Sequence, residues 1–321
     1  MAGAKSPTLP MAGIGNYRHE ACLYQGAAEL LQLASDLIDD AVAAGEPIMV
    51  ALGPEVIEQL GRRHPQPGVY FVDIHALGRN PARIIPAWQD FIDEYAQPGR
   101  GVRGIGEPIW SDRKGAALSE CQHHEALLNT ALGDPMFWLV CPYDTDTLDA
   151  AVIAEAWRTH PMVRQAGKCQ PSPRYPGLQG LADQEPSALS QPPDGAPVLV
   201  VGPEELAVLR SFVAEEAHGA GLTSERLGDL VLAANEIVAN SLAHGGGRGT
   251  VRLWSEPDTV VCEVRDVGHL DDPMAGRRRP PITAPGGRGL WLANQLCDLV
   301  QIRSGDDGTV IRLHLAISRP G

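Results

Sequence analysis

The sequence predicts two α/β domains, the first with a doubly wound, largely parallel sheet and the second with an α/β sandwich. In the first half of the 321-residue chain, short apolar runs alternate with helical patterns, an order typical of parallel sheets. In the second half, two helical patterns precede a hairpin, a third helical pattern and two closing strands, which favours helices on one face of an antiparallel or mixed sheet. The length and the 44% hydrophobic content suffice for two cores.

The first half contains apolar runs of strand length separated by amphipathic patterns of helix length. The expected strands are residues 47–52, 69–72, 102–109 and 136–141. The expected helices are residues 26–44, 54–63, 81–96, 113–132 and 146–159. The first expected strand is followed by Gly53-Pro54-Glu55 and not by a G-x-x-x-x-G-K-[ST] loop, so this domain is not expected to bind ATP.

A segment rich in proline and glycine separates the two halves. It covers residues 166–196 and has a composition that does not form a packed core, so it is predicted to be a linker. The predicted organisation is an N-terminal tail at 1–16, a first domain at 17–165 and a second domain at 197–317.

The second half opens with an apolar run and two helical patterns. Its expected strands are residues 198–201, 249–256, 259–266, 299–303 and 308–316. Its expected helices are residues 203–219, 222–244 and 287–298. The pair of strands between the second and third helices reads as a hairpin.

Three separated motifs in the second half predict an ATP site. Glu236 and Asn240 are four residues apart on one helical face, and a carboxylate beside an amide oxygen suits Mg²⁺. The chain continues with Asp266-Val-Gly268 and then with Gly286-Gly287-Arg288-Gly289-Leu290, where bare backbone N–H groups at a helix start can hold phosphates.

These motifs resemble the histidine-kinase-like (GHKL, Bergerat-fold) ATPases over residues 197–317, and most closely the serine kinases that act as anti-sigma factors. The resemblance implies that Glu236 is the general base and that Asn240 binds the Mg²⁺ of ATP. It also implies that Asp266 accepts from the adenine amino group. The other residues that it implies in ATP binding are Gly268, Gly287, Arg288, Gly289, Leu290 and Thr309.

The expected lid over this site is residues 270–286. It contains Arg277-Arg278-Arg279, for which a solvated loop and a phosphate or partner contact are equally open. The chain departs from many members of the family at Leu270, where a second glycine is common.

The first half resembles the MEDS sensory domain of bacterial regulators, which is related to a RecA-like core without ATPase motifs. The resemblance covers residues 17–165 and is carried by His19-Glu-Ala-Cys22-Leu-Tyr24, Gly106-Glu107-Pro108-Ile-Trp110, Glu120-Cys121-Gln-His123-His124-Glu125 and Cys141-Pro142-Tyr143-Asp144. It implies a sensory role toward an unknown small-molecule signal.

Histidines and cysteines gather in the motifs of this first half. The group offers soft metal ligands but matches no standard zinc spacing. Its members are His19, Cys22, Cys121, His123, His124 and Cys141. His124 has a second interpretation as the phosphoacceptor of a sensor histidine kinase, and a third as an ordinary buried residue.

Composition narrows the class of protein. The net charge of −14 disfavours direct nucleic-acid binding and suits a basic protein partner. We expect no membrane span, because no run reaches about 18 apolar residues. The cysteines lie far apart and form no C-x-x-C pair, which is consistent with reduced thiols and indicates a cytoplasmic protein.

Together these features predict a transcription and stress-response regulator that uses ATP and Mg²⁺. By resemblance, it holds a sigma factor and phosphorylates an anti-anti-sigma (STAS-type) protein on serine or threonine, under control of the first domain. The alternatives are a non-catalytic ATP-binding anti-sigma or adaptor protein and a sensor histidine kinase. A homodimer is left open.

Overall fold

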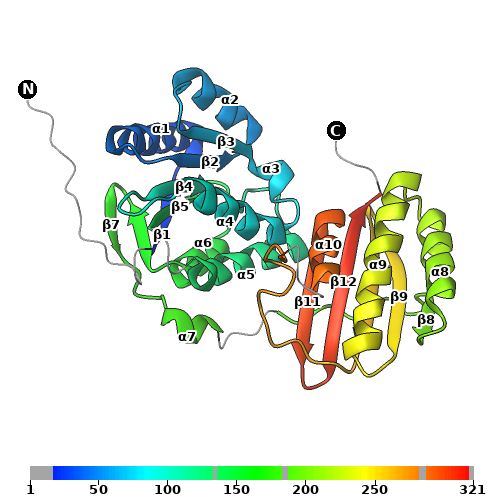
Figure 1. Ribbon diagram of the computed structural model, residues 1–321. Helices are drawn as coiled ribbons and strands as arrows, with labels where there is room; N and C mark the ends of the chain where they lie inside the picture. The colour runs from blue at the N-terminus through cyan, green and yellow to red at the C-terminus, as the bar shows by residue number, and fades with distance from the viewer. Residues whose placement is uncertain (1–16, 133–135, 183–186, 282–286, 318–321) are drawn as a thin grey trace, which may run out of the picture. The chain divides into compact units, whose positions relative to one another are not determined.

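The computed structural model describes residues 17–132, 136–182, 187–281 and 287–317, so the predicted tail lies outside the described residues. Contacts divide the chain into two compact units, each with its own sheet (Figure 1). The first unit comprises residues 1–75, 89–112 and 128–184, and the second comprises residues 76–88, 113–127 and 185–321. The predicted domain boundaries at residues 166 and 197 remain a prediction.

The first unit is built on a seven-stranded sheet in the order β3-β2-β4-β5-β1-β6-β7. Its strands are β1 (Tyr17–Tyr24), β2 (Ile48–Leu52), β3 (Val69–Asp73), β4 (Val102–Gly106), β5 (Phe137–Asp144), β6 (Met162–Gln165) and β7 (Lys168–Pro171). All neighbours pair in parallel except β6 and β7. This arrangement confirms the predicted largely parallel sheet.

Helices α1 (Gly26–Ala44) and α2 (Pro54–Arg63) pack with β2 in the core of this unit. The apolar positions of α1 recur at helical spacing, so Leu30, Ala34 and Ile38 are all buried. The helix ends at Gly45, which has a φ of 69° and donates its N–H to the last turn. The unit also contains α6 (Ala150–Thr159) and α7 (Gly177–Ala182).

Three strands of this sheet were not predicted. Strand β1 contains charged residues, yet it is almost wholly buried. Its Glu20 has a fully buried side chain that accepts from Arg18 at 2.5 Å and from Arg164 at 2.6 Å. Buried charges of this kind are tolerated when they are paired. Because the pairing is not visible in the sequence, the charged residues of β1 have the pattern of an exposed segment. Strands β6 and β7 are short, and β7 falls within the predicted linker.

Four further elements lie along the chain between β3 and β5. They are α3 (Ile74–Leu77), the 3₁₀ turn η1 (Pro81–Arg83), α4 (Ile84–Tyr95) and α5 (Gly115–Ala131). The residues of α3, α4 and α5 are shared between the two units.

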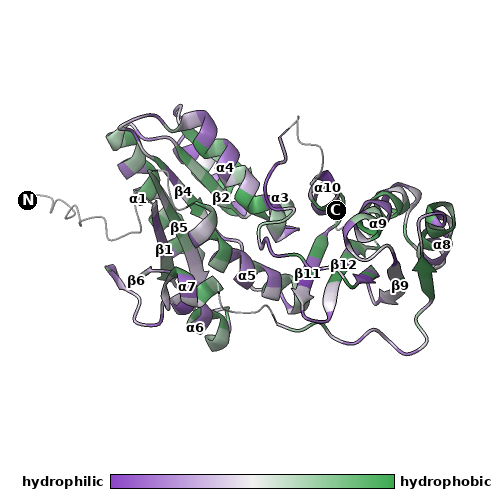
Figure 2. Ribbon diagram, turned by 60° about the horizontal axis from the view of Figure 1, so that its bottom comes forward, coloured by the Kyte–Doolittle hydropathy of each residue, from purple (hydrophilic) through white to green (hydrophobic). Residues whose placement is uncertain are grey.

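The second unit is built on a five-stranded antiparallel sheet in the order β11-β12-β10-β9-β8. Its strands are β8 (Val198–Val201), β9 (Gly249–Glu256), β10 (Thr259–Asp266), β11 (Leu299–Gly305) and β12 (Gly308–Ala316). Its main helices are α8 (Leu206–Gly219), α9 (Ser224–His244) and α10 (Arg288–Leu296). The three helices lie on one face of the sheet (Figures 1 and 2), which confirms the predicted α/β sandwich.

The core of this unit lies between the helices and the sheet. Helix α9 buries Leu230, Ala234, Ile237 and Val238 against apolar residues of the strands. Its other stripes are polar, so both colours of the hydropathy scale run along α9 in Figure 2. The polar residues of α9 therefore lie outside the core and can contribute to a binding site.

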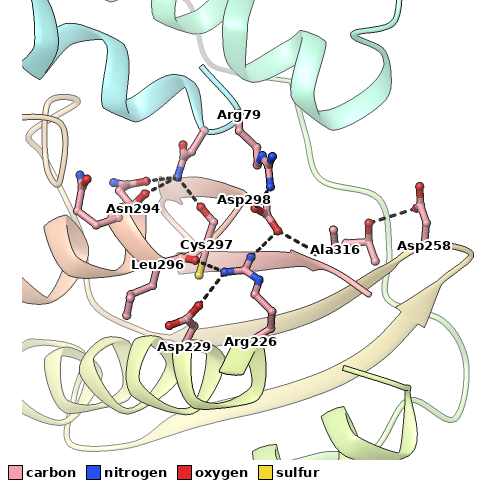
Figure 3. Close-up of polar contacts among 12 residues, drawn as sticks. Arg79, Arg226, Asp229, Asp258, Asn294, Leu296, Cys297, Asp298 and Ala316 are labelled. Carbon is pink, nitrogen blue, oxygen red and sulfur yellow. Dashed lines mark hydrogen bonds and ion pairs between the residues drawn. The ribbon is translucent and has the colours of Figure 1, made fainter. Parts of the chain in front are cut away.

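A buried arginine fixes α9 against the end of α10 (Figure 3). Arg226 donates to Asp229 at 2.8 Å, to the carbonyl of Leu296 at 2.9 Å and to Asp298 at 2.5 Å. Asp298 also accepts the N–H of Ala316 at 2.8 Å. These contacts join the first turn of α9 to the junction of α10 and β11, and thereby set the two helices that carry the nucleotide motifs.

None of the helices within the described residues combines the length and the apolar character needed to cross a bilayer.

Candidate nucleotide-binding site

Helix α9 presents Glu236 and Asn240 on one face. Both side chains are half-buried and stand one helical turn apart, as the sequence predicts. The neighbouring Ala233 and Ile237 are fully buried, so the backbone of α9 is held in place beneath the polar pair. The pair offers one carboxylate and one amide within a single turn.

The glycine motif reaches this pair through Gly289. A Cβ built on Gly289 would lie 2.9 Å from Asn240 Nδ2 and 3.4 Å from Glu236 Cβ. The absence of a side chain therefore lets the first turn of α10 approach α9 directly. The preceding Gly287 is the N-cap of α10 and has a φ of 82°, a conformation that glycine adopts without strain. The structure thus brings the helix start and the Glu236–Asn240 pair together.

Asp266 stands at the end of β10, beside the C-terminus of α9. Its Oδ1 accepts the N–H of Gly268 at 2.7 Å. A Cβ on Gly245 would lie 2.3 Å from Asp266 Cγ, and a Cβ on Gly268 would lie 2.8 Å from Gly245 Cα. Two glycines are therefore required for the aspartate turn to pack on the helix end, one turn beyond Asn240.

Thr309 braces the same turn from β12. It pairs in register with Asp266, and its Oγ1 donates to the carbonyl of Gly268 at 2.9 Å. Ser304 lies 2.9 Å from Thr309 Oγ1 and accepts the N–H of Leu270 at 2.8 Å. The chain of hydrogen bonds from Leu270 through the two hydroxyls to Gly268 fixes the start of the expected lid. The sequence did not single out Ser304, because a serine in a closing strand carries no motif.

The remaining motif residues lie where α10 begins. Arg288 and Gly289 form its first turn, and Leu290 follows within the helix. Leu290 Cβ would lie 2.9 Å from a Cβ on Gly276, so the expected lid packs closely on α10. Gly286 and residues 282–285 of the expected lid lie outside the described residues.

The arginines of the expected lid are not alike. Arg277 is buried and pairs with Glu120 at 3.2 Å, while Arg278 and Arg279 are exposed. Burial lowers the pKa of Arg277, and Glu120 opposes that shift. Glu120 also pairs with Arg303 at 2.9 Å. The sequence left open whether these arginines lie in a solvated loop or contact a phosphate or a partner. Arg277 is not solvated, so the first interpretation does not apply to it.

The predicted histidine and cysteine group divides among different elements. His19 on β1 and Cys141 on β5 come together in the first unit, with His19 Nε2 3.4 Å from Cys141 Sγ. Cys22 projects from the opposite face of β1, and burial raises its pKa to about 12. His160, which no motif indicated, joins His19 with a ring separation of 4.1 Å.

The other three members of the group lie on α5, in its portion that belongs to the second unit. Burial raises the pKa of Cys121 to about 12 and lowers the pKa of His123 to about 3. His124 is fully buried. A phosphoacceptor must be reached by a nucleotide, so the burial of His124 argues against the histidine-kinase interpretation.

The chain matches two protein-family models. Residues 18–161 match the MEDS model, described as the methanogen/methylotroph, DcmR sensory domain. Residues 200–315 match the histidine kinase-like ATPase domain. No curated protein matches the sequence.

Among solved structures, the chain is similar to one described as the crystal structure of the RsbU and RsbW domains of Rv1364c from Mycobacterium tuberculosis. The two are 23% identical, and the match covers 39% of this chain and 33% of that chain with a TM-score of 0.28. The chain thus spans only about a third of that protein's length.

Proposed function

We propose that this chain, which carries a MEDS sensory domain and a histidine kinase-like ATPase domain, is an ATP-dependent serine/threonine protein kinase of the anti-sigma type. One observation carries the proposal. Gly289 seats the start of α10 against Glu236 and Asn240, while Asp266 stands one turn farther along α9. The residues that we propose as general base and Mg²⁺ ligand lie on α9, and those that we propose for phosphate and adenine binding pack beside it.

The adenine end is served by Asp266. The N–H of Gly268 and the packing of Gly245 hold its carboxyl group in one orientation. A carboxylate so fixed accepts a hydrogen bond from an exocyclic amino group without further ordering, and such charge-assisted bonds contribute about 1.5–3 kcal/mol. Asp266 would thereby select adenine.

The phosphate end is served by α10 and α9. The N–H groups of the first turn of α10 would offer a phosphate the positive end of the helix dipole, and Gly289 lets this turn approach α9 closely. Asn240 would supply an oxygen ligand for Mg²⁺, and a bound Mg²⁺ would neutralise phosphate charge. Glu236, one turn away, would accept the proton of an incoming serine or threonine hydroxyl.

The partners follow from the resemblance to anti-sigma kinases. We propose that the protein holds a sigma factor and phosphorylates a STAS-type anti-anti-sigma protein. The net charge of −14 suits a basic partner surface and speeds encounter at low salt. The first domain would alter this output when its small-molecule signal binds, provided that the signal favours one domain state over another.

Phosphoryl transfer tests the proposal. Full-length protein is incubated with γ-labelled ATP, Mg²⁺ and a candidate anti-anti-sigma protein, and acid-stable label on the partner is counted. Glu236→Gln is expected to slow transfer by about 10²–10⁴-fold, the usual contribution of a general base, with ATP binding retained. Glu215→Gln, on an exposed position of α8, is the matched control and is expected to leave the rate unchanged.

The outcomes separate the alternatives. Transfer by Glu236→Gln at the wild-type rate would remove Glu236 from the mechanism. ATP binding without transfer to any partner would favour the non-catalytic adaptor. Acid-labile label on the protein itself would favour a histidine kinase.

A further inference from the structure

We propose that the first unit contains a binding site for a divalent transition-metal ion, best matched to Zn²⁺, formed by His19, Cys141 and His160. The inference goes beyond the proposed kinase function and does not rest on it. It assigns chemistry to the first domain, whose ligand neither the sequence nor the family description names. Sequence spacing alone did not indicate it, because His19 is more than a hundred positions from Cys141 and His160, and the three residues follow no zinc motif.

Three elements of the sheet bring these residues to one place. Cys141 on β5 lies opposite Ala21 in the parallel register, and His19 stands two residues before Ala21 on the same face of β1. His160 is the C-cap of α6 and directly precedes β6, which pairs with β1 on its other side. The site is therefore centred on β1, between its two neighbouring strands. The exposed fractions of the three residues are at most 2%.

The ligand atoms lie close enough together to share one ion. One ring nitrogen of each histidine and Cys141 Sγ lie within 4.8 Å of one another. His19 Nε2 and Cys141 Sγ are 3.4 Å apart. Zinc bonds of about 2.0–2.1 Å to nitrogen and about 2.3 Å to sulfur, at a tetrahedral angle, place these two ligand atoms about 3.5 Å apart. The spacing of these two atoms therefore already matches that of two ligands of one zinc ion.

The hydrogen bonds around His19 fix its tautomer. Asn129 Nδ2 donates to the carbonyl of Thr159 at 2.8 Å, so the amide oxygen of Asn129 is the atom that faces His19. That oxygen lies 3.1 Å from His19 Nδ1 and only accepts. His19 therefore carries its proton on Nδ1, and Nε2 keeps a lone pair directed toward Cys141.

His160 has the same arrangement. Its Nδ1 lies 2.9 Å from the carbonyl of Ala156, which only accepts, so the proton is again on Nδ1. Thr159 Oγ1 donates to the carbonyl of Glu155 and is 3.1 Å from the same nitrogen, so it also accepts from His160. Metal-binding histidines typically donate one ring N–H to an oxygen and bind the ion through the other nitrogen. Two histidines with this pattern converge on one thiol.

The donor set selects the class of ion. Two neutral imidazoles and a thiolate suit Zn²⁺ and related first-row ions, whereas Mg²⁺ and Ca²⁺ require oxygen ligands. Binding replaces the S–H bond of Cys141 with a sulfur–metal bond, and one proton passes to solvent for each ion. Tyr17 stacks on His19 and Tyr143 meets the edge of His160, so aromatic rings surround the ligands.

Cys141, His19 and Asn129 also have the order of a cysteine nucleophile, its base and an orienting amide. The three are between 1% and 3% exposed, so a molecular substrate does not reach the sulfur. An ion is small enough to be enclosed, which favours the metal site over a hydrolase.

Cobalt spectroscopy tests the proposal on the full-length protein. The protein is stripped with a chelator and titrated with Co²⁺, and the thiolate-to-cobalt charge-transfer band and the visible bands of tetrahedral cobalt are recorded. We expect one equivalent to bind and Zn²⁺ to displace it. A cation at the oxygen ligands of the ATP site would give no sulfur band, so the two sites are distinguished.

Variants identify the ligands. Cys141→Ser is expected to abolish the sulfur band, while Cys22→Ser, a buried cysteine on the opposite face of β1, is expected to retain it. Asn129→Leu removes the acceptor of His19 and is expected to weaken Zn²⁺ binding by about 10–100-fold. Circular dichroism establishes that each variant is folded.

Absence of the sulfur band in folded wild-type protein would overturn the proposal and leave an S–H···N hydrogen bond between Cys141 and His19. A band that persists in Cys141→Ser, or disappears in Cys22→Ser, would also overturn it. If Cys141→Ser does not fold, His160→Asn is measured in its place, and the wild-type stoichiometry still decides.

Discussion

At the scale of single residues, the candidate nucleotide site depends on positions that lack a side chain. Gly289 sits against Asn240 and Glu236, and Gly245 sits against the carboxyl group of Asp266. Each lets two backbone segments approach to a distance that no other residue permits. The side chains of the candidate site are therefore placed by their glycine neighbours.

Gly289→Ala is expected to displace Asn240, because the new Cβ would lie 2.9 Å from Asn240 Nδ2. We predict that binding of Mg²⁺–ATP to the full-length protein weakens about tenfold, or about 1.4 kcal/mol, when measured by calorimetry. Gly228→Ala on α9 is the control, since a Cβ there meets nothing within 4 Å. That control is expected to leave ATP affinity unchanged and to stabilise the helix by about 0.5–1 kcal/mol. Equal affinity for the two variants would contradict the placement of Gly289.

Glu107 provides a pH-dependent test in the first unit. Burial raises its pKa from 4.5 to about 7; the hydrogen bond from Tyr24 opposes this shift and Asp144 adds to it. Between these pH values the folded protein retains a proton that the unfolded chain releases, so the free energy of unfolding falls as pH rises, by about 3 kcal/mol at most. Glu107→Gln is expected to flatten this part of the profile in urea titrations. Parallel profiles for the two proteins would show that Glu107 does not contribute.

At the scale of elements, one buried arginine sets the geometry of the site helices. Arg226 joins the start of α9 to the end of α10 through Asp229, Asp298 and a backbone carbonyl (Figure 3). The acidic partners are only partly exposed, so removal of the cation leaves their charges poorly solvated.

Arg226→Met is therefore expected to destabilise the second unit by about 2–4 kcal/mol, measured from the denaturant midpoint of its unfolding transition. Arg210→Met is the matched control, because Arg210 is exposed and makes one hydrogen bond to Asn235. Its expected effect is below about 0.5 kcal/mol. A similar loss for both variants would indicate a general effect of removing positive charge.

The elements that the sequence predicted best were those with an uninterrupted period. The hairpin of β9 and β10 and the closing strand β12 alternate apolar residues between clear turns, and their bounds were predicted to the residue. Strand β1 was missed because its buried ion pairs read as surface charge. Motif spacing indicated Glu236, Asn240 and Asp266, but His160 stands outside any motif and is found only through the pairing of β6 with β1.

At the scale of the whole molecule, each of the two units is made of segments that are not consecutive in the sequence. Residues 76–88 and 113–127, which lie inside the segment matched by the sensory model, belong to the second unit. In that unit Arg83 donates to the carbonyl groups of Asn294, Gln295 and Cys297 at the end of α10, each at 2.8 Å. The amino-acid composition predicts a flexible linker. Composition carries no information about hydrogen bonds between distant segments, so the contacts of Arg83 could not be predicted from it.

The most direct test of the ATP site is calorimetry of Mg²⁺–ATP binding to full-length wild-type protein, Asp266→Ala and Asp306→Ala. Asp266 would lose a charge-assisted hydrogen bond to adenine, so its variant is expected to bind about 1.5–3 kcal/mol more weakly, or about 10- to 150-fold. Asp306, in the exposed turn between β11 and β12, is expected to have no effect. Equal affinity of wild type and Asp266→Ala would contradict the account.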